Sequence, residues 1–280
     1  MGINPVDVLY RQGKSSIPLP FTPGSDCAGI VEAVGSDVHH ISVGDRVFAG
    51  SVNQGAYAEL MNCQANLVFH LPKNLSYAQG ASLFIPYFTA FRALVSYGRL
   101  QKSESVLIHG ATGGVGTAAV QIAKELGAQI IGTGGSEYGR DLLRKLGAQQ
   151  VVDHRQPNHH EEILKLTGGK GVDVLIEIVS GFFRTDLDMM APFGRIVSVV
   201  GGVFELPVHE LMHKDISITG IGVFNTPDVD KKAIAEWLTA HLEKGSFYPV
   251  IREEFPLSSA SSAHELLARP GAAGKLILIP

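Results

Sequence analysis

Short apolar runs alternate with amphipathic stretches through the middle of the chain. The runs that predict buried strands cover residues 106–108, 130–131, 151–152, 172–178, 196–200 and 216–221. The stretch after the first run repeats apolar residues at helical spacing from Val115 to Leu126, and Gly127 ends it. Because these strands are apolar throughout and helices separate them, the pattern predicts a six-strand parallel sheet covered on both faces, which is an α/β doubly wound fold.

The segments on either side of this region differ from it. Residues 1–85 contain short strand-like pieces that many glycines and prolines interrupt. Beyond Phe224, two helical stretches and an apolar strand at 276–279 follow. We therefore predict a discontinuous β-rich domain made of residues 1–85 and 224–280, into which a nucleotide-binding domain of residues 86–223 is inserted.

The composition narrows the class of protein. Of the 280 residues, 45% are hydrophobic and 18% are charged, which is ordinary for a globular chain. The net charge of -4 gives no general attraction to nucleic acid or to an anionic membrane. The only cysteines, Cys27 and Cys63, belong to no CxxC cluster, so we expect neither a disulfide framework nor a cysteine-rich zinc lobe. Without an apolar run of roughly 18 residues or a signal-peptide pattern, a cytoplasmic protein is expected.

The sharpest motif lies directly after the first predicted strand. Residues 109–116 match the pattern GxGxxG, with Ala111 in the first glycine position, Gly113 in the second and Gly116 in the third. Gly113 has no side chain, so a pyrophosphate can approach the backbone, and Gly116 lets the helix pack closely on the strand. The helix N-terminus then presents unpaired N–H groups to the phosphates. The strand–loop–helix context predicts a dinucleotide site rather than a turn that serves packing alone.

The residues after the second predicted strand bear on the choice of coenzyme. An NAD site places an Asp or Glu there to hold the ribose hydroxyls, whereas this strand ends in Gly134-Gly135-Ser136. These small residues leave room for the extra phosphate of NADP, and Ser136 offers it a hydrogen bond. Arg140 follows within reach, with a solvated helix face as the alternative, and His154 is expected on the adenosine side. Glu137 is the contrary observation, but the pattern favours NADPH.

Ligands for a metal are scarce in the first segment. A zinc dehydrogenase needs cysteine, histidine and carboxylate ligands, and Ser25 stands where a ligating histidine would be expected. The pairs His39-His40 and His159-His160 lie in polar surroundings, and we expect both pairs to be exposed. No metal site is therefore predicted. Without a Lewis acid, acceptors that take hydride readily, such as quinones or activated enones, suit the protein better than alcohols.

Seven short motifs occur in order along the chain. They are Gly-Ile-Asn-Pro-Val-Asp at 2–7, Thr-Pro-Gly-Ser-Asp-Cys-Ala-Gly at 22–29, Gly-Asp-Arg-Val-Phe at 44–48, Gly-Ala-Tyr-Ala-Glu at 55–59, Ile-Pro-Tyr-Phe-Thr-Ala at 85–90, the glycine loop at 109–116 and Ala-Gly-Lys at 273–275. Together they resemble the zinc-independent quinone oxidoreductases of the ζ-crystallin type, in the medium-chain dehydrogenase/reductase superfamily. The resemblance implies a GroES-like substrate domain, a Rossmann domain, a cleft between them, and reduction of ortho- and para-quinones by NADPH.

The resemblance also implies site residues. The expected cofactor contacts are Thr112, Gly113, Gly114 and Val115 at the phosphates, Gly135 and His154 at the adenosine end, and Val200, Gly201, Gly202, Val203, Ile221, Gly222 and Val223 on the nicotinamide side. Each set follows a parallel strand, where the crevice of such a sheet lies. The catalytic candidates are Asn4, Tyr57 and Thr89. Asn4 and Thr89 are expected to face the nicotinamide. Tyr57 either hydrogen-bonds a quinone oxygen or is a core aromatic of the β-rich domain.

Three departures from the family pattern stand out. Leu9 replaces the tyrosine that follows the Asn-Pro-Val segment, with Tyr10 beside it, and Phe183 replaces an asparagine that contacts the cofactor. Family members also carry several dozen residues before the segment that begins here at Gly2. Because those residues form the opening strands of the substrate domain, the resemblance implies a shortened domain with exposed strand edges.

Three functions stay open from the sequence. The first is metal-free hydride transfer from NADPH to a small quinone, for which the protein supplies orientation and a dry site. The second is reduction of an activated C=C bond by an enoyl or alkenal reductase. The third is a non-catalytic NADPH-binding role, structural or RNA-binding, which the resemblance also allows. The family forms homo-oligomers, and the apolar sixth strand at 216–221 suits the pairing of sheet edges in a dimer or tetramer.

Overall fold

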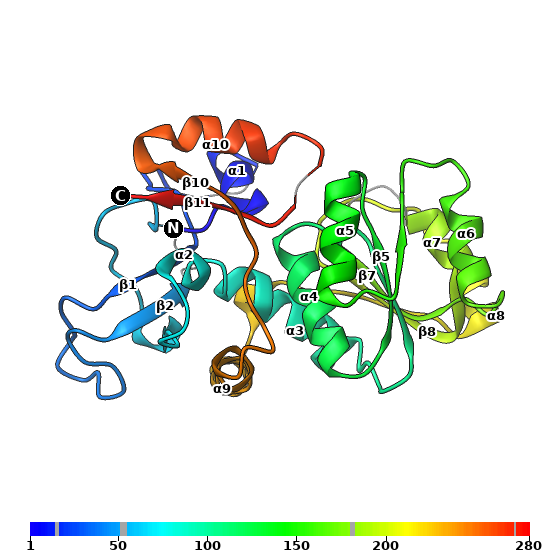
Figure 1. Cartoon of the computed structure of the whole chain (residues 1–280), viewed down its shortest axis with the longest axis horizontal. Helices are drawn as coiled ribbons and strands as arrows, with labels where there is room; N and C mark the ends of the chain where they lie inside the picture. Colours follow the sequence, from blue (N-terminus) through cyan, green and yellow to red (C-terminus); the bar gives the residue numbers. More distant parts are fainter. Residues whose placement is uncertain (15–16, 51–54, 180–182, 272) are drawn as a thin grey trace. The chain divides into compact units, whose positions relative to one another are not determined.

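The chain forms two compact units. The computed structural model describes residues 1–14, 17–50, 55–179, 183–271 and 273–280. One unit comprises Met1–Phe88 with Thr226–Pro280, and the other comprises Thr89–Asn225 (Figure 1). The boundaries expected from the sequence, after residues 85 and 223, lie beside the observed ones.

The second unit is built on one six-stranded sheet in the order β6-β5-β4-β7-β8-β9. The strands are β4 (Ser105–Ile108), β5 (Gln129–Thr133), β6 (Gln150–Val152), β7 (Val172–Glu177), β8 (Met190–Ser198) and β9 (Ser217–Gly220). Every neighbouring pair runs parallel, which confirms the doubly wound α/β fold. The strand order reverses between β4 and β7, and sheets of this class bind ligands beside the carboxyl ends of such a pair.

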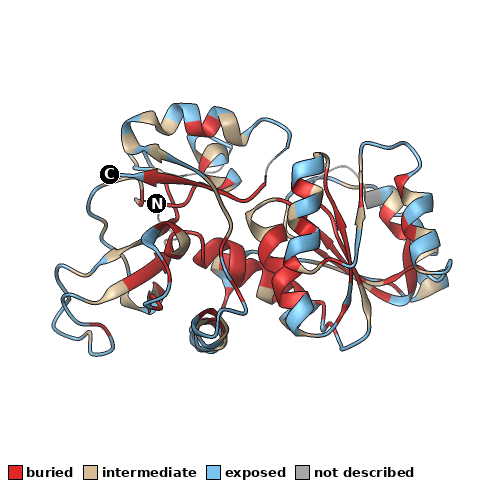
Figure 2. Ribbon diagram, in the orientation of Figure 1, coloured by how far each residue is buried: buried red, intermediate tan, exposed pale blue. Residues whose placement is uncertain are grey.

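Helices connect these strands and pack against the sheet. They are α3 (Thr89–Phe91), the π-helix η3 (Arg92–Tyr97), α4 (Gly114–Glu125), α5 (Glu137–Leu146), α6 (His159–Leu166), α7 (Phe183–Asp188), α8 (Val208–Lys214) and the 3-10 helix η4 (Val223–Asn225). The sequence signals define α5 clearly. Ser136 accepts a hydrogen bond from the Gly139 N–H at its start, and Gly147 ends it with a left-handed φ of +116°. Figure 2 shows the strands buried and the outer helix faces exposed.

The first unit combines two small sheets with short helices. One sheet is antiparallel, with β1 (Asp26–Ile30), β2 (Arg46–Gly50) and β3 (Val68–His70), and the other pairs β10 (Ile251–Pro256) in parallel with β11 (Lys275–Ile279). The helices are α1 (Pro5–Arg11), η1 (Ala65–Leu67), α2 (Tyr77–Gly80), the π-helix η2 (Phe84–Phe88), α9 (Asp228–Glu243), η5 (Leu257–Ser259) and α10 (Ala260–Leu267). Gly2 bridges to both Asp26 and Ile277. A Cβ on Gly2 would lie 2.0 Å from the Ala81 carbonyl oxygen, so only glycine fits there.

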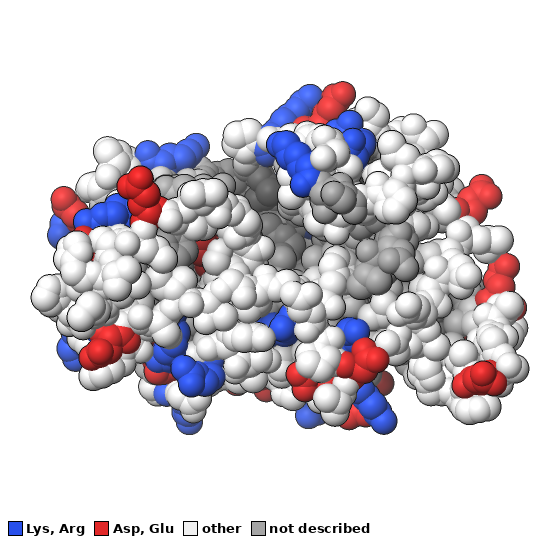
Figure 3. Space-filling view, turned by 180° about the vertical axis from the view of Figure 1, so that it is seen from behind, with Lys and Arg blue, Asp and Glu red and all other residues white. Residues whose placement is uncertain are grey.

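Charges of both signs are spread over the surface. On the face drawn in Figure 3, Lys and Arg side chains are interspersed with Asp and Glu side chains, and neither sign forms a continuous area. None of the described helices is both long and apolar enough to cross a bilayer.

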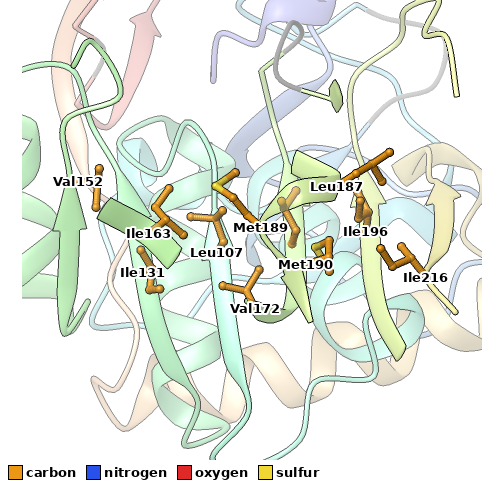
Figure 4. Packing of buried hydrophobic residues seen from close by; sticks show 11 residues of the cluster. Leu107, Ile131, Val152, Ile163, Val172, Leu187, Met189, Met190, Ile196 and Ile216 are labelled. Carbon is orange, nitrogen blue, oxygen red and sulfur yellow. The ribbon is translucent and has the colours of Figure 1, made fainter. Parts of the chain in front are cut away.

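An apolar cluster holds the strands of the second unit in register. Its buried members, each at most 8% exposed, are Leu107, Ile131, Val152, Ile163, Val172, Leu175, Leu187, Met189, Met190, Ile196 and Ile216. Figure 4 shows their side chains side by side along the sheet. Full burial of one such side chain stabilises a fold by about 1.5–3 kcal/mol. The cluster therefore fixes the strand ends that carry the loops of the candidate site.

Candidate active site

The glycine loop has the geometry of a phosphate-binding turn. Helix α4 begins at Gly114 with Gly113 as its N-cap, at φ -76° and ψ -179°. A Cβ on Gly116 would lie 2.4 Å from the Ala111 Cα, so close packing of the helix requires glycine there. A Cβ on Gly113 would meet nothing nearer than the Gly110 carbonyl oxygen at 3.6 Å. The fold therefore explains Gly116, while Gly113 leaves open space at the helix N-terminus.

Thr112 joins this loop to the loop that follows β5. A Cβ on Gly134 would lie 2.9 Å from the Thr112 Cγ2, and a Cβ on Gly139 would lie 2.8 Å from it. The Ala111 N–H also donates to the Thr133 carbonyl oxygen at 3.2 Å. Both glycines are therefore needed for the threonine to fit, while Gly114 and Val115 form the start of α4.

The predicted adenosine-end residues lie together after β5 and β6. A Cβ on Gly135 would lie 3.1 Å from the His154 Nε2 and 3.6 Å from the Arg155 Cδ. The Ser136 Oγ accepts the N-cap hydrogen bond of α5, and its own O–H hydrogen is left for a second partner. Glu137, the contrary observation in the sequence, is exposed. The strand end thus presents small residues beside a histidine and an arginine.

Asp153, directly after β6, binds two arginines. The Arg140 Nη1 donates to the Asp153 Oδ2 at 2.9 Å and to the carbonyl oxygens of Gly134 and Gly135 at 3.2 and 3.3 Å. Arg155 donates from Nε and Nη2 to the same carboxylate at 3.0 and 2.7 Å. These hydrogen bonds, led by those of Arg155, hold the pKa of Asp153 well below its usual range.

The two arginines differ in exposure, because 18% of the Arg140 side chain and 62% of the Arg155 side chain are accessible. Arg140 was predicted from the sequence, whereas Arg155 was not. The signal was available, because Asp153-His154-Arg155 directly follows the third predicted strand.

The two predicted nicotinamide-side loops meet at the ends of neighbouring strands. Ser198, the last residue of β8, accepts a hydrogen bond from the Ile221 N–H at 2.9 Å. Its Oγ donates to the Val200 carbonyl oxygen at 3.1 Å. The loop at 200–203 and the loop at 221–223 are therefore tied to the same residue.

Arg92 anchors the second of these loops from η3. Its guanidinium donates to the Gly222 carbonyl oxygen and, at 3.3 Å, to the Tyr97 hydroxyl. Val223 is buried, whereas Gly201, Gly202 and Val203 are exposed. Thr89, the catalytic candidate of this unit, begins α3 and is 7% exposed.

Asn4 lies in a buried polar cluster of the first unit. Its Nδ2 donates to the Asp26 Oδ2 at 3.0 Å, and its Oδ1 accepts from the Lys275 ammonium. The same ammonium lies 3.3 Å from the Asp26 Oδ2. Burial lowers the pKa of Lys275, and Asp26 opposes that shift. A lysine cation thus neutralises Asp26 and fixes the amide of Asn4.

Tyr57 belongs to a chain of polar side chains in the same unit. Its hydroxyl lies 3.3 Å from the Asp7 Oδ2 and 3.0 Å from the His264 Nε2. Ser25 donates to the other Asp7 oxygen at 3.1 Å, and Arg11 donates to the His264 Nδ1 at 3.3 Å. Burial raises the pKa of Asp7 to about 6 and lowers the pKa of His264. The chain connects buried Ser25 with exposed Arg11, and Tyr57 is its only member that was predicted from the sequence to be catalytic.

One expectation about the histidines was wrong. His159 is 4% exposed rather than solvated, and its Nδ1 hydrogen-bonds with the Gln156 carbonyl oxygen at 2.7 Å. The reason is helical spacing, because His159 stands four residues before the buried Ile163 on α6 and shares its face.

Of the positions that depart from the family pattern, Leu9 is 43% exposed. The side chain of Phe183 is outside the described residues.

Comparison with known proteins places the chain among oxidoreductases. Residues 114–239 match the family model described as zinc-binding dehydrogenase, and residues 1–73 match the alcohol dehydrogenase GroES-like domain. The quinone oxidoreductase of Rattus norvegicus is 43% identical over 99% of this chain and 86% of its own length. The quinone oxidoreductase of Pseudomonas aeruginosa is 35% identical over 100% of this chain and 89% of its own length. The structure of Escherichia coli quinone oxidoreductase complexed with NADPH matches with a TM-score of 0.90 and 32% identity, over 100% of this chain and 89% of that chain.

A Rossmann unit with a glycine loop, joined to a GroES-like unit, defines a medium-chain dehydrogenase/reductase. Within that superfamily, the chain belongs to the zinc-independent quinone oxidoreductases, as its motifs predict.

The polar cluster of the first unit does not fit a zinc ion. Structural and catalytic zinc sites use cysteine, histidine and carboxylate ligands. Here Asn4 and Ser25 offer an amide and a hydroxyl, both of which are hydrogen-bonded to neighbouring carboxylates. The carboxylate of Asp26 already pairs with Lys275. No step of the reaction is therefore assigned to a metal at this cluster.

Proposed function

We propose that this protein is an NADPH-dependent reductase that transfers hydride to small ortho- and para-quinones without a metal. The observation that carries the proposal is the glycine loop, where Gly113 faces open space at the N-terminus of α4. That space suits a pyrophosphate, which the helix N–H groups and the helix dipole stabilise. The names of the relatives favour quinone reduction over the enoyl-reductase and non-catalytic alternatives.

The cofactor lies along the carboxyl ends of the parallel strands in this proposal. Thr112, Gly113, Gly114 and Val115 bind the pyrophosphate, and the adenosine end lies against Gly135 and His154. The 2'-phosphate binds Ser136, Arg140 and also Arg155, whose Nη1 makes no hydrogen bond to Asp153. Guanidinium groups suit this role because they bind phosphate oxygens in pairs. The nicotinamide lies against Val200, Gly201, Gly202, Val203, Ile221, Gly222 and Val223.

Hydride transfer leaves a proton to be supplied. Bound NADPH would supply a hydride, which is two electrons with one hydrogen, and the quinone that accepts it would become a hydroquinone anion. We assign delivery of the proton to Tyr57, with Asn4 and Thr89 positioning the ring. The Tyr57 hydroxyl gives its proton to the anion and regains one along the chain through His264 or Asp7. Burial raises the pKa of Tyr57, so the hydroxyl is fully protonated before hydride is transferred.

Side-by-side assays test the reaction class. With a small quinone, kcat/KM for NADPH should exceed that for NADH by roughly tenfold or more, because only NADPH engages the charged 2'-phosphate site. The quinone should be reduced faster than an activated enone, and dialysis against a chelator should leave the rate unchanged. Faster turnover of the enone would establish the C=C reductase. Tight NADPH binding without turnover of any acceptor would establish a non-catalytic role.

Replacement of Tyr57 by phenylalanine tests the proton donor. We expect kcat for the quinone to fall by roughly tenfold, because general acid catalysis contributes about 10²–10⁴-fold and water replaces part of it. The Kd for NADPH should stay within about twofold, since the tyrosine lies outside the Rossmann unit. Tyr77→Phe is the matched control, because this tyrosine stacks under Arg46 in the same unit. Equal kcat for both variants and the wild type would remove Tyr57 from the reaction.

We also propose a cytoplasmic homo-oligomer, a dimer or a tetramer. Strand β9 stands at one edge of the six-stranded sheet, and an unpaired edge is suited to pairing with a second copy. Sedimentation velocity would give the number of subunits. The mixed charges of the face in Figure 3 offer no continuous basic area there for RNA.

A further inference from the structure

Three buried ionisable side chains meet beneath the glycine loop. His109 follows β4, Glu177 ends β7 and Asp186 lies on α7, and none is more than 1% exposed. Their nitrogen and oxygen atoms lie within 4.8 Å of one another. Strands β4 and β7 are the pair at which the strand order reverses. The cluster therefore lies where the sheet opens toward its ligand.

The close approach of two buried carboxyl groups in this cluster indicates a shared proton. The His109 Nε2 and the Asp186 Oδ1 are 3.0 Å apart, and the Val179 N–H donates to the Glu177 Oε1 at 2.6 Å. In the described part of the chain, the buried Glu177 Oε2 and Asp186 Oδ2 accept from no N–H or hydroxyl group. An oxygen of each carboxyl group nevertheless lies within 4.8 Å of an oxygen of the other. Two ionised carboxylates that are buried this close together repel each other, so one of the two carries a proton.

The cluster connects three loops of the cofactor site. The Thr133 Oγ1, at the end of β5, accepts from the Gly110 N–H at 3.2 Å and lies 3.5 Å from the His109 Nδ1. A Cβ on Gly110 would lie 3.0 Å from the Val179 Cγ1, in the segment that Glu177 holds. A change of charge at the carboxyl pair thus acts directly on the backbone that begins the phosphate-binding turn.

We propose that Glu177 and Asp186 share one proton, which His109 helps to hold, and that this proton positions the glycine loop for NADPH. The inference rests on the cofactor site of the proposed function, though not on the identity of the acceptor. Loss of the proton places a second buried negative charge behind the turn. That charge repels both its neighbour and the bound diphosphate, so NADPH affinity falls as the pair ionises.

The pH at which the carboxyl pair loses its proton follows from the burial of these groups. Burial raises the pKa of Glu177 to about 8 and that of Asp186 to about 7, and it lowers the pKa of His109, which stays neutral. Carboxyl groups with raised pKa values stabilise the fold at low pH, and this contribution is lost as the pH rises through the raised values. The other titratable groups that act on this region are His154, His159, His160 and Asp188. The shared proton, which is the last proton of the pair, should therefore be lost near pH 8.

Calorimetry on the wild-type protein tests the proton directly. Because bound NADPH disfavours the second charge, binding at pH 8 should take up a fraction of a proton from the buffer. Buffers of different ionisation enthalpy measure that fraction. The 2'-phosphate, with a second pKa of about 6, is already ionised at pH 8 and does not contribute. No proton exchange at pH 8 would overturn the proposal.

The variants Glu177→Gln and Asp186→Asn test whether these two carboxyl groups cause the pH dependence of NADPH binding. Wild-type Kd for NADPH should rise on the order of fivefold between pH 6.5 and pH 8.5, and this rise should disappear in either variant. The matched control is Asp173→Asn, which removes a carboxylate from the opposite end of β7 that accepts from Ser105. The control should keep the wild-type pH profile.

The following results would overturn the proposal or leave a single measurement to test it. Coincident pH profiles for the wild type and both cluster variants would overturn the shared proton. Stoichiometric zinc or another divalent ion in the purified protein, lost in Glu177→Gln, would overturn it too, because a cation would then hold the carboxylates. If both variants fail to fold, the calorimetric proton count decides alone. Failure of quinone turnover would leave NADPH binding and its pH profile measurable, so this inference and the proposed reaction fail separately.

Discussion

Valine in place of Gly113 should severely weaken NADPH binding and leave the fold intact. The residue has φ -76° and ψ -179°, which any amino acid adopts. Its Cβ would find no protein atom closer than 3.6 Å. The N-cap position of α4 prefers glycine to valine, so the substitution costs about 1 kcal/mol, and Tm should fall by no more than about 4 °C. The new methyl groups would occupy the space assigned to the pyrophosphate, so Kd for NADPH should rise on the order of a hundredfold or more.

Two other glycines make this experiment specific. Gly116→Val should lower Tm severely or prevent folding, because its Cβ would lie 2.4 Å from the Ala111 Cα. Gly29→Val, on β1 in the other unit, has open space around its Cβ and should change neither property. Thermal unfolding and NADPH fluorescence titration, measured on all three variants, separate folding from binding. Unchanged NADPH affinity in Gly113→Val would show that no phosphate lies at this turn.

The fold was predictable because its signals are local. Strands β4, β5, β6 and β7 each contain an apolar run, and α5 has a clear start residue, Ser136, and a clear stop residue, Gly147. In a parallel sheet, such runs leave few arrangements, since crossover connections are right-handed and short. The glycine loop was predictable for the same reason, because strand, turn and helix are contiguous in the sequence.

The polar networks were not predictable, because their partners are distant in the sequence. His109 and Asp186 are 77 residues apart, and Asn4 and Lys275 are 271 residues apart. No periodicity links such positions, and a single sequence contains no covariation. Asp7 and His264 were missed in the same way, although Tyr57, which contacts both, was named. Tertiary packing alone makes these residues neighbours.

The coenzyme preference could be predicted from the sequence only in part. The absence of an acid after β5 is a local signal, and it predicts room for a 2'-phosphate at Gly134 and Gly135. The positive charge at that place comes partly from Arg155, after β6, which Asp153 orients. Since β5 and β6 are neighbours in the sheet, their carboxyl ends supply one site from two segments. A substitution at Gly135 tests both contributions together.

Aspartate in place of Gly135 should reverse the coenzyme preference. Two unit charges separated by about 5 Å, at an effective dielectric constant of about 20, repel by roughly 3 kcal/mol, and this is the repulsion expected between such a carboxylate and a 2'-phosphate bound at this strand end. That repulsion corresponds to a loss of NADPH affinity on the order of a hundredfold. The same carboxylate can accept hydrogen bonds from the ribose hydroxyls of NADH, so NADH should bind more tightly than it does to the wild type.

The matched control is Gly135→Asn, which has nearly the same size without the charge. Both side chains approach His154, because a Cβ at this position would lie 3.1 Å from its Nε2. Any steric cost is therefore common to the two variants, and the difference between them measures the electrostatic effect. Kd values for NADPH and NADH should diverge strongly between aspartate and asparagine at low ionic strength and converge as salt screens the charges. Equal NADPH affinity in the two variants, at low salt, would place the 2'-phosphate away from this strand end.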